Sequence, residues 1–335
     1  MADYPAAQTL VNLRGTDPDP PTPRAVMEDV IRRFEPTAQL PNDEAAVAEI
    51  YRDLLSRHKS LPILDNARNG AQVHSLLPPP PSAAFITSRR HMDLPGVVIR
   101  ALDSLDRNDA AALLVDLYVE HAPGAVPDAA ALASLASACV DHPLALRVAG
   151  TFAANRAGRI DHARYVAQII EQRDRLKLNG IPDHDVMGSL SLSLERLTEE
   201  DAGLAERWRD LAVFPADFDA AAAAAVWAEN SSEKAIETLT ELADRGFLEA
   251  SGNRFRLHDL IRDLARHYQN EDRLHAAAAR HAAHYLKVLA DADALYLAGG
   301  AEKILSGLAL YDREQANIHV GWDHAVTAMI DAESA

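Results

Sequence analysis

The sequence predicts an α/β domain followed by mainly α-helical domains. Over the first hundred residues, short apolar runs alternate with helical patterns, as in a parallel sheet covered by helices. After residue 105 the apolar residues recur at helical spacing, apart from a short strand–turn–strand pattern near residue 250. With 335 residues, 48% of them apolar and 25% charged, the chain is long enough for two or three domains with a large core.

The first predicted domain spans residues 1–104 and contains part of a parallel, doubly wound sheet. Thr22 and Pro23 form a helix start, because a capping hydroxyl precedes a proline at the first helical position, and Asn42 with Asp43 and Glu44 starts a second helix. The predicted strands are residues 9–13, 61–64, 83–87 and 97–102.

Three further domains follow from changes in the pattern. Residues 105–180 are predicted to be helical, with helices at 107–120, 127–139, 143–157 and 160–176. Pro182 opens the third domain, residues 181–270, which is helical to residue 246 and then shows two short strands joined at Ser251-Gly252-Asn253 and one helix. That order is typical of a winged helix. Residues 271–335 form a last helical domain.

The composition argues against several classes of function. The formal net charge of −17 does not suit a nonspecific nucleic-acid surface or an anionic-membrane surface, which need dense Lys and Arg. The single cysteine, Cys139, cannot form an internal disulfide and is expected in the core. The first residues lack the pattern of a signal peptide, and the longest apolar run, 220–228, is shorter than the roughly 20 residues that span a bilayer. We expect a cytoplasmic protein without membrane or nucleic-acid partners.

The stretch "SLPILDNARNGAQ" carries the clearest chemical signal. Four apolar residues run directly into Asp65 and Asn66. A buried strand that ends in a carboxylate can hold a Mg²⁺-bound water beside a glycine-rich phosphate loop, but the sequence contains no Gly-Lys dipeptide from which such a loop is built. The alternative is a strand that ends in a turn-forming Asp-Asn pair.

The order of the motifs resembles the NB-ARC (AP-ATPase) module of STAND signalling ATPases, in the bacterial type associated with transcriptional activators and tetratricopeptide repeats. "LVNLRGTDPDPPTPR" resembles the segment after that family's phosphate-loop helix, "LPILDNARNGAQV" its Walker B strand and "FITSRR" its sensor strand. "DHPLALRVAG" resembles its GLPLAL motif, and "RLHDLIRDLARHY" its MHD-type motif with Leu257 in place of methionine. "LYLAGGAEKILSGLALYDREQANI" resembles the segment that leads into its repeats.

The resemblance implies roles for residues in the first domain. Asp65 would hold the Mg²⁺-bound water, and Asn66 stands where many relatives carry a second carboxylate, so slow or absent hydrolysis is implied. Thr87 and Arg89 end the next strand, where an arginine would sense a γ-phosphate. The alternative for Arg89 is a solvated basic turn, because Arg90 follows it directly.

The resemblance also implies roles for two residues at predicted helix starts. Pro143 would pack by the adenine, and His258 would contact the β-phosphate of ADP. The alternatives are a plain first-turn proline and a helix-capping His-Asp pair, made by His258 with Asp259. His275, His281 and His284 lie close together on one predicted helix, where a solvated helix face is a simpler interpretation than a metal site.

The missing phosphate loop shapes the functional expectation. In the family the strand that carries this loop lies at the centre of the sheet, so its absence would leave a gap between the strands at 9–13 and 61–64 and those at 83–87 and 97–102. We expect a piece of a longer protein, a degenerate copy, or a chain completed by another chain. ADP or ATP with Mg²⁺ would bind only if the loop is supplied, and hydrolysis by this chain alone is not expected.

Three functions remain open at this stage. The first is a nucleotide switch or its remnant. The second is a non-catalytic protein-interaction scaffold, with other proteins, a second copy or an intact homologue as partners. The third is a winged-helix transcriptional regulator, for which the acidic segment around residues 199–206 provides a poor phosphate-facing surface.

Overall fold

A computed structural model describes Tyr4, residues 7–15, 20–90, Met92, 94–178 and 184–334. The chain divides into two compact units, Met1–Leu102 and Asp103–Ala335. Residues 16–19, which belong to the stretch "LVNLRGTDPDPPTPR", Pro182 and the predicted boundary between residues 180 and 181 lie outside the described residues.

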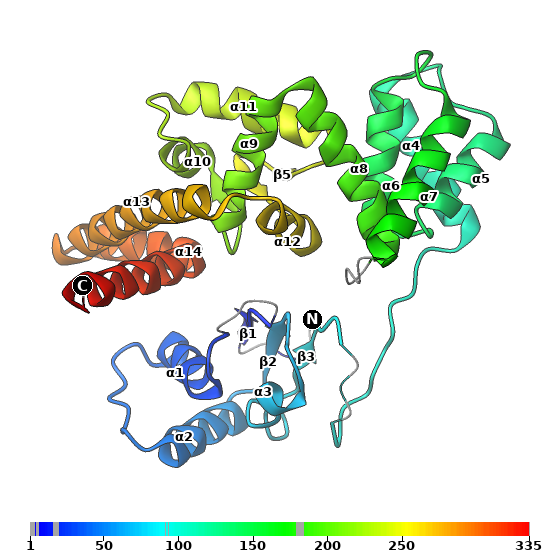
Figure 1. Cartoon of the computed structure of the whole chain (residues 1–335). Coiled ribbons are helices and arrows are strands. Elements are labelled where there is room, and N and C mark those ends of the chain that lie inside the picture. Colours follow the sequence, from blue (N-terminus) through cyan, green and yellow to red (C-terminus); the bar gives the residue numbers. More distant parts are fainter. Residues whose placement is uncertain are drawn as a thin grey trace. The chain divides into compact units, whose positions relative to one another are not determined.

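Within its described residues, the first unit contains a three-stranded parallel sheet and three helices, as Figure 1 illustrates. In chain order its elements are β1 (Ala7–Asn12), α1 (Pro23–Phe34), α2 (Glu44–Arg57), β2 (Ser60–Asp65), α3 (Gly70–His74) and β3 (Phe85–Ile86). β2 lies between the other two strands and pairs with β1 in a register that sets Asn12 opposite Asp65. The strands predicted at 9–13, 61–64 and 83–87 are thus confirmed, the third in a shorter form.

The helices α1 and α2 begin where the capping signals predict. The Thr22 hydroxyl accepts a hydrogen bond from the N–H of Ala25 at 3.2 Å, and the Asp43 carboxylate accepts one from the N–H of Ala46 at 3.0 Å. Their apolar faces share one buried core with the sheet, formed by Val11, Leu13, Val26, Met27, Val30, Ile31, Val47, Tyr51, Leu54, Leu55 and Leu64.

Two predictions about this sheet are wrong. Residues 97–102 form neither strand nor helix, and the side chains of Val98 and Leu102 are 81% and 97% exposed. A strand needs a neighbouring strand to which its backbone can form hydrogen bonds. The predicted neighbour, β3, is only 2 residues long and offers few such bonds to residues 97–102. The expected gap in the sheet is also wrong, because Ile63 pairs with Phe85 and Leu64 with Ile86. This pairing satisfies backbone groups that a gap would leave buried and unbonded.

The second unit is mostly helical. Its first elements are α4 (Arg107–His121), α5 (Ala129–Ala138), α6 (Pro143–Ala154), α7 (His162–Leu178), α8 (His184–Glu200) and α9 (Ala202–Asp210). They are followed by the 3₁₀ turn η1 (Leu211–Val213), β4 (Phe218–Asp219), α10 (Ala220–Val226), α11 (Ser232–Asp244), β5 (Glu249–Ser251), β6 (Arg254–Arg256) and α12 (Asp259–His267). The last two helices are α13 (Glu271–Leu297) and α14 (Ala301–Ser334).

The predicted strand–turn–strand–helix segment is confirmed. β5 and β6 pair antiparallel on either side of Gly252, whose φ of 59° suits glycine, and α12 follows. The sequence analysis missed β4, which pairs with β6 and completes a small sheet in the order β4–β6–β5.

The helices α13 and α14 lie side by side as a hairpin joined by residues 298–300, which include Gly299 and Gly300 (Figure 1). One continuous core links α4 to α14 and includes the large side chains of Trp208, Phe214 and Tyr285. Among the described residues, none of the helices combines the length and the apolar character needed to cross a bilayer.

Candidate functional site

The carboxyl ends of β2 and β3 bring three of the predicted site residues together. The Thr87 hydroxyl donates to Oδ1 of Asp65 at 2.5 Å and accepts from the N–H of Asn66 at 2.9 Å. Asp65 and Thr87 thus form one hydrogen-bonded pair. They lie at the edge of the strands where ligands bind in open parallel sheets.

Asn66 forms the turn that follows β2. Its φ is 56°, a left-handed conformation that asparagine tolerates better than most residues, and the residue is only 6% exposed. Its carbonyl accepts a hydrogen bond from the N–H of Gly15 at 2.7 Å. These features agree with the turn-forming interpretation of the Asp-Asn pair, and a role of Asn66 in nucleotide binding stays a prediction.

Gly15 and Gln72 hold this edge together, and the sequence analysis missed both. A Cβ on Gly15 would lie 2.4 Å from the nitrogen of Arg68 and 2.4 Å from the carbonyl oxygen of Asn66. Gln72 accepts from the N–H of Arg68 at 2.9 Å and donates to the carbonyl of Leu13 at 2.9 Å. The loops after β1 and β2 are thereby fixed to each other.

The turn after β3 is held by Ser88. Its hydroxyl donates to the carbonyl of Ala67 at 2.8 Å and accepts from the N–H of Arg90 at 3.0 Å. Arg89 lies between these two residues and is exposed. Arg89 is two residues after Thr87 in the chain, and its role as a phosphate sensor stays a prediction.

Asp65 offers the kind of ligand that Mg²⁺ prefers. Mg²⁺ in nucleotide sites usually keeps several waters and is held through one or two carboxylates together with phosphate oxygens. Within the described part of the chain, no cluster of three or more His, Cys, Asp or Glu side chains is arranged to hold a metal. An ion at this edge would therefore rest on Asp65, water and phosphate.

Of the three histidines near each other on α13, His281 is not on a solvated face, so that interpretation is wrong for this residue. It is 1% exposed and lies against the rings of Phe214 and Tyr285, with centroid distances of 5.2 and 4.7 Å. Burial lowers the pKa of His281 to about 4. The apolar residues around η1 pack on α13 and cover this side chain.

Pro143 and His258 both lie in the second unit at helix starts. Pro143 is the first residue of α6. His258 caps α12, because its Nδ1 accepts a hydrogen bond from the N–H of Leu260 at 3.3 Å, and Asp259 forms an ion pair with Arg262 at 3.0 Å. The capping interpretation of His258 is confirmed. Contacts of Pro143 or His258 with a nucleotide stay predictions.

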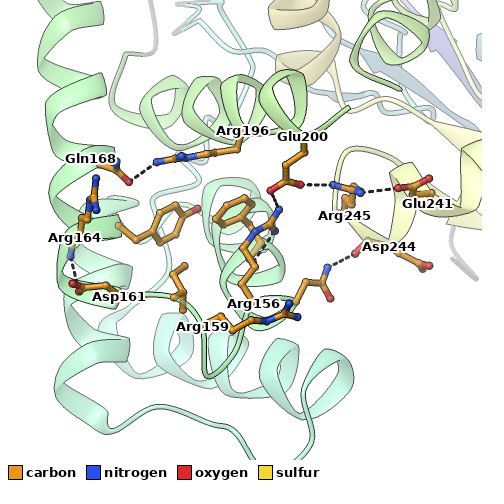
Figure 2. A pocket seen from close by; sticks show the side chains of 14 residues that line it. Arg156, Arg159, Asp161, Arg164, Gln168, Arg196, Glu200, Glu241, Asp244 and Arg245 are labelled. Atoms are coloured by element: carbon orange, nitrogen blue, oxygen red, sulfur yellow. Dashed lines mark hydrogen bonds and ion pairs between the residues drawn. The ribbon is translucent and has the colours of Figure 1, made fainter. Parts of the chain in front are cut away.

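The second unit also contains a cavity of about 920 Å³ that the sequence analysis did not anticipate (Figure 2). Five arginines line it: Arg156, Arg159, Arg164, Arg196 and Arg245. They come from the end of α6, the following turn, α7, α8 and the end of α11, so no local pattern in the sequence connects them.

Comparison with known proteins finds sequence similarity to two regulatory proteins. It is 33% identical over 270 residues to the regulatory protein AfsR of Streptomyces coelicolor, which covers 79% of this chain and 26% of that protein. It is 32% identical over 268 residues to AfsR of Streptomyces griseus, covering 78% of this chain and 27% of that protein. The chain thus spans about a quarter of the length of these relatives. No protein-family profile matches it.

A solved structure shares the fold. The STAND protein with a tetratricopeptide repeat sensor from Pyrococcus horikoshii aligns with a TM-score of 0.54 and 15% sequence identity, over 96% of this chain and 47% of that one. The sequence relatives and the shared fold together support the assignment of the chain as an NB-ARC-like module of the STAND type, similar to about a quarter of the length of the AfsR regulatory proteins.

Proposed function

We propose that the chain is a signalling module whose conformation responds to ADP and ATP when a phosphate loop is supplied. The observation that carries this proposal is the hydrogen-bonded pair of Asp65 and Thr87 at the carboxyl edge of adjacent parallel strands. In that arrangement Asp65 would orient a Mg²⁺-bound water, and Arg89 would lie near the terminal phosphate.

The switch would work by differential affinity. A ligand shifts a conformational equilibrium only by as much as it prefers one state over the other. Under the proposal, ADP stabilises a closed state through Pro143 and His258, and ATP favours an open state that exposes surfaces for other proteins or a second copy. The small sheet β4–β6–β5 with α12 would act as a winged helix between these states.

The chain alone is expected to bind nucleotide weakly. Backbone N–H groups of a glycine-rich loop and its lysine supply most of the grip on phosphate, and the sequence has no Gly-Lys dipeptide. The amide side chain of Asn66 provides no general base. Turnover by this chain alone is therefore not part of the proposal.

The test uses a fluorescent ADP analogue with and without Mg²⁺. The full chain is expected to bind it too weakly to retain ADP through purification. Fusing a strand with a G-x-x-x-x-G-K-[ST] loop and helix ahead of Met1 is expected to strengthen binding. In that fusion, Asp65→Asn should remove the Mg²⁺ dependence, whereas the exposed Asp103→Asn control should keep it. Tight ADP binding by the unfused chain, or Mg²⁺ dependence that survives Asp65→Asn, would contradict the proposal.

A second function, a protein-interaction scaffold, is supported by α14. Trp322, Val326 and Met329 are spaced on one helical face and are 53%, 38% and 66% exposed. We propose that α13 and α14 begin a tetratricopeptide-like region and that this face packs against a further helix or a partner protein. Self-association of the chain, measured by light scattering, should weaken in Trp322→Ala if a second copy is the partner; unchanged association would assign the face to another occupant.

A further inference from the structure

The arginine-lined cavity of the second unit lies away from Pro143, one of the residues discussed for the nucleotide. Pro143 is the first residue of α6, and the cavity begins at Phe152 near the other end of that helix. A rise of 1.5 Å per residue over the 12 residues of α6 separates the two helix ends by about 18 Å. The cavity therefore needs its own explanation.

One wall of the cavity is a fixed chain of ion pairs (Figure 2). Glu200 bonds to Arg156 and, at 3.0 Å, to Arg245, which also bonds to Glu241 at 2.7 Å. Burial acts to raise the pKa of Glu200, but the two arginines outweigh it and hold the pKa below its usual value. Glu200 therefore stays ionised at neutral pH and fixes both guanidinium groups.

Aromatic rings support the same wall. The Arg156 guanidinium lies 3.8 Å from the centroid of the Phe152 ring, and the Tyr165 ring stacks on Phe152 with centroids 5.1 Å apart. Arg156 is thus positioned by a carboxylate and by a ring at once. The Phe152 ring is already covered by these two side chains, so recognition in this cavity rests on charge more than on stacking of a planar ligand.

Two further arginines, Arg159 and Arg164, contribute cationic groups to the cavity lining. Within the described part of the chain, the side chains of Arg159 and Arg164 form no ion pair, and both residues are exposed at the cavity. The carboxylate of the nearby Asp161 accepts a hydrogen bond from the N–H of Arg164 at 3.0 Å, at the start of α7. Figure 2 shows Arg164 on the side of the cavity opposite the Glu200 ion pairs.

We propose that this cavity binds a small anion with at least two negative charges, held by Arg159, Arg164 and Arg156. The planar fork of arginine suits both phosphate and carboxylate groups. A volume of about 920 Å³ falls within the range of small-molecule sites. Phosphate compounds and polycarboxylates share this chemistry.

The bound anion would also act on the second unit as a whole. It would compete with Glu200 for Arg156, and Glu200 is the residue that links Arg156 beyond α6 to Arg245 at the end of α11. Binding therefore weakens one connection between α6 and α11 and replaces it by contacts with the ligand. This site is independent of the proposed nucleotide switch, since it uses none of the residues at the sheet edge.

The experiment is calorimetric titration of the full chain with inorganic pyrophosphate and, separately, with citrate, at an ionic strength kept constant with chloride. Saturable binding is expected for one or both anions. Binding of pyrophosphate alone would assign the site to phosphate compounds, and binding of both to multivalent anions in general. The double variant Arg159→Gln/Arg164→Gln is expected to raise the Kd at least tenfold.

The control is Arg256→Gln, which removes an exposed arginine of β6 that does not line the cavity. It is expected to keep the wild-type Kd, as is Asp65→Asn, which separates this site from the nucleotide proposal. Circular dichroism verifies that each variant is folded, and the exposed positions of Arg159 and Arg164 favour folding. Absence of saturable binding by both anions, or equal loss in the double variant and in Arg256→Gln, would overturn the proposal.

Discussion

His281 illustrates how a single buried residue couples the stability of the second unit to pH. Its ring is enclosed by Phe214 and Tyr285, with His284 and His324 near enough to lower its pKa further. Since the folded-state pKa of about 4 lies below the usual 6.5, the unfolded chain binds a proton that the folded chain does not at intermediate pH. Stability is therefore complete above pH 6.5 and decreases as the pH falls towards 4.

We predict that this histidine alone costs about 2 kcal/mol between pH 7 and pH 5, from 1.36 kcal/mol per pKa unit. Urea unfolding followed by tryptophan fluorescence measures it, because Trp208, Trp227 and Trp322 all lie in the second unit. At pH 7, His281→Gln should have a lower free energy of unfolding than the wild type. Between pH 7 and pH 5, its free energy of unfolding should decrease by less than that of the wild type. The control is His275→Gln, at an exposed position on the same helix. Its free energy of unfolding should decrease between pH 7 and pH 5 by as much as that of the wild type.

Glu314 is the second residue whose change is expected to be costly. It is 3% exposed and bonds to Arg254 at 2.5 Å, which ties β6 to α14. Burial acts to lower the pKa of Arg254, but its bonds to Glu314 and Asp217 raise it above the usual value. Removing one partner of a buried pair leaves the other charge poorly compensated.

Glu314→Gln is expected to destabilise the second unit by about 3 kcal/mol, the lower end for breaking such pairs, because Asp217 remains beside Arg254. The same fluorescence-detected urea titration gives the value. Asp323→Asn, an exposed change on α14, should stay within about 0.5 kcal/mol of the wild type. Equal effects of the two variants would show that the buried pair is not what holds β6 on α14.

At the scale of elements, the α13–α14 hairpin depends on two glycines with different clearance. A Cβ on Gly307 would lie 2.6 Å from the carbonyl oxygen of Ala292, whereas one on Gly321 would lie 3.2 Å from Cα of Ala282. Alanine favours a helix over glycine by about 1 kcal/mol, and overpacking costs roughly 1–3 kcal/mol. Gly307→Ala should therefore destabilise the hairpin, and Gly321→Ala should be nearly neutral, as measured by thermal unfolding.

Local signals located the elements, but they did not determine which elements pair. Thr22 with Pro23 and the Ser251-Gly252-Asn253 turn each act within a few residues, so both were correct. The pairing of β2 with β3 depends on contacts across 22 residues, and the sequence analysis placed a gap there. Asp65 and Thr87 could be selected as candidate site residues from the sequence because each ends an apolar run. Gln72 and the cavity arginines follow no such run, so the sequence does not single them out.

At the scale of the whole molecule, the two units are expected to unfold separately. The segment that joins them runs through residues 97–106 without helix or strand, and Leu102 is 97% exposed there. The first unit has a sheet whose last strand is 2 residues long, while the second has a continuous core from α4 to α14. A short sheet with a small core gives less burial per residue than a large helical core.

We predict that brief chymotrypsin treatment cuts after Leu102 and leaves a fragment that begins at Asp103 and keeps the tryptophan-detected unfolding transition of the full chain. Open backbone with exposed apolar side chains is the preferred substrate of such a protease. Leu102→Asp should slow this cut without changing the transition, because the side chain contacts little that unfolding would release. A shift of the transition by more than the error of measurement after cleavage would mean that the first unit stabilises the second, and the cavity titration would then have to be interpreted for the full chain only.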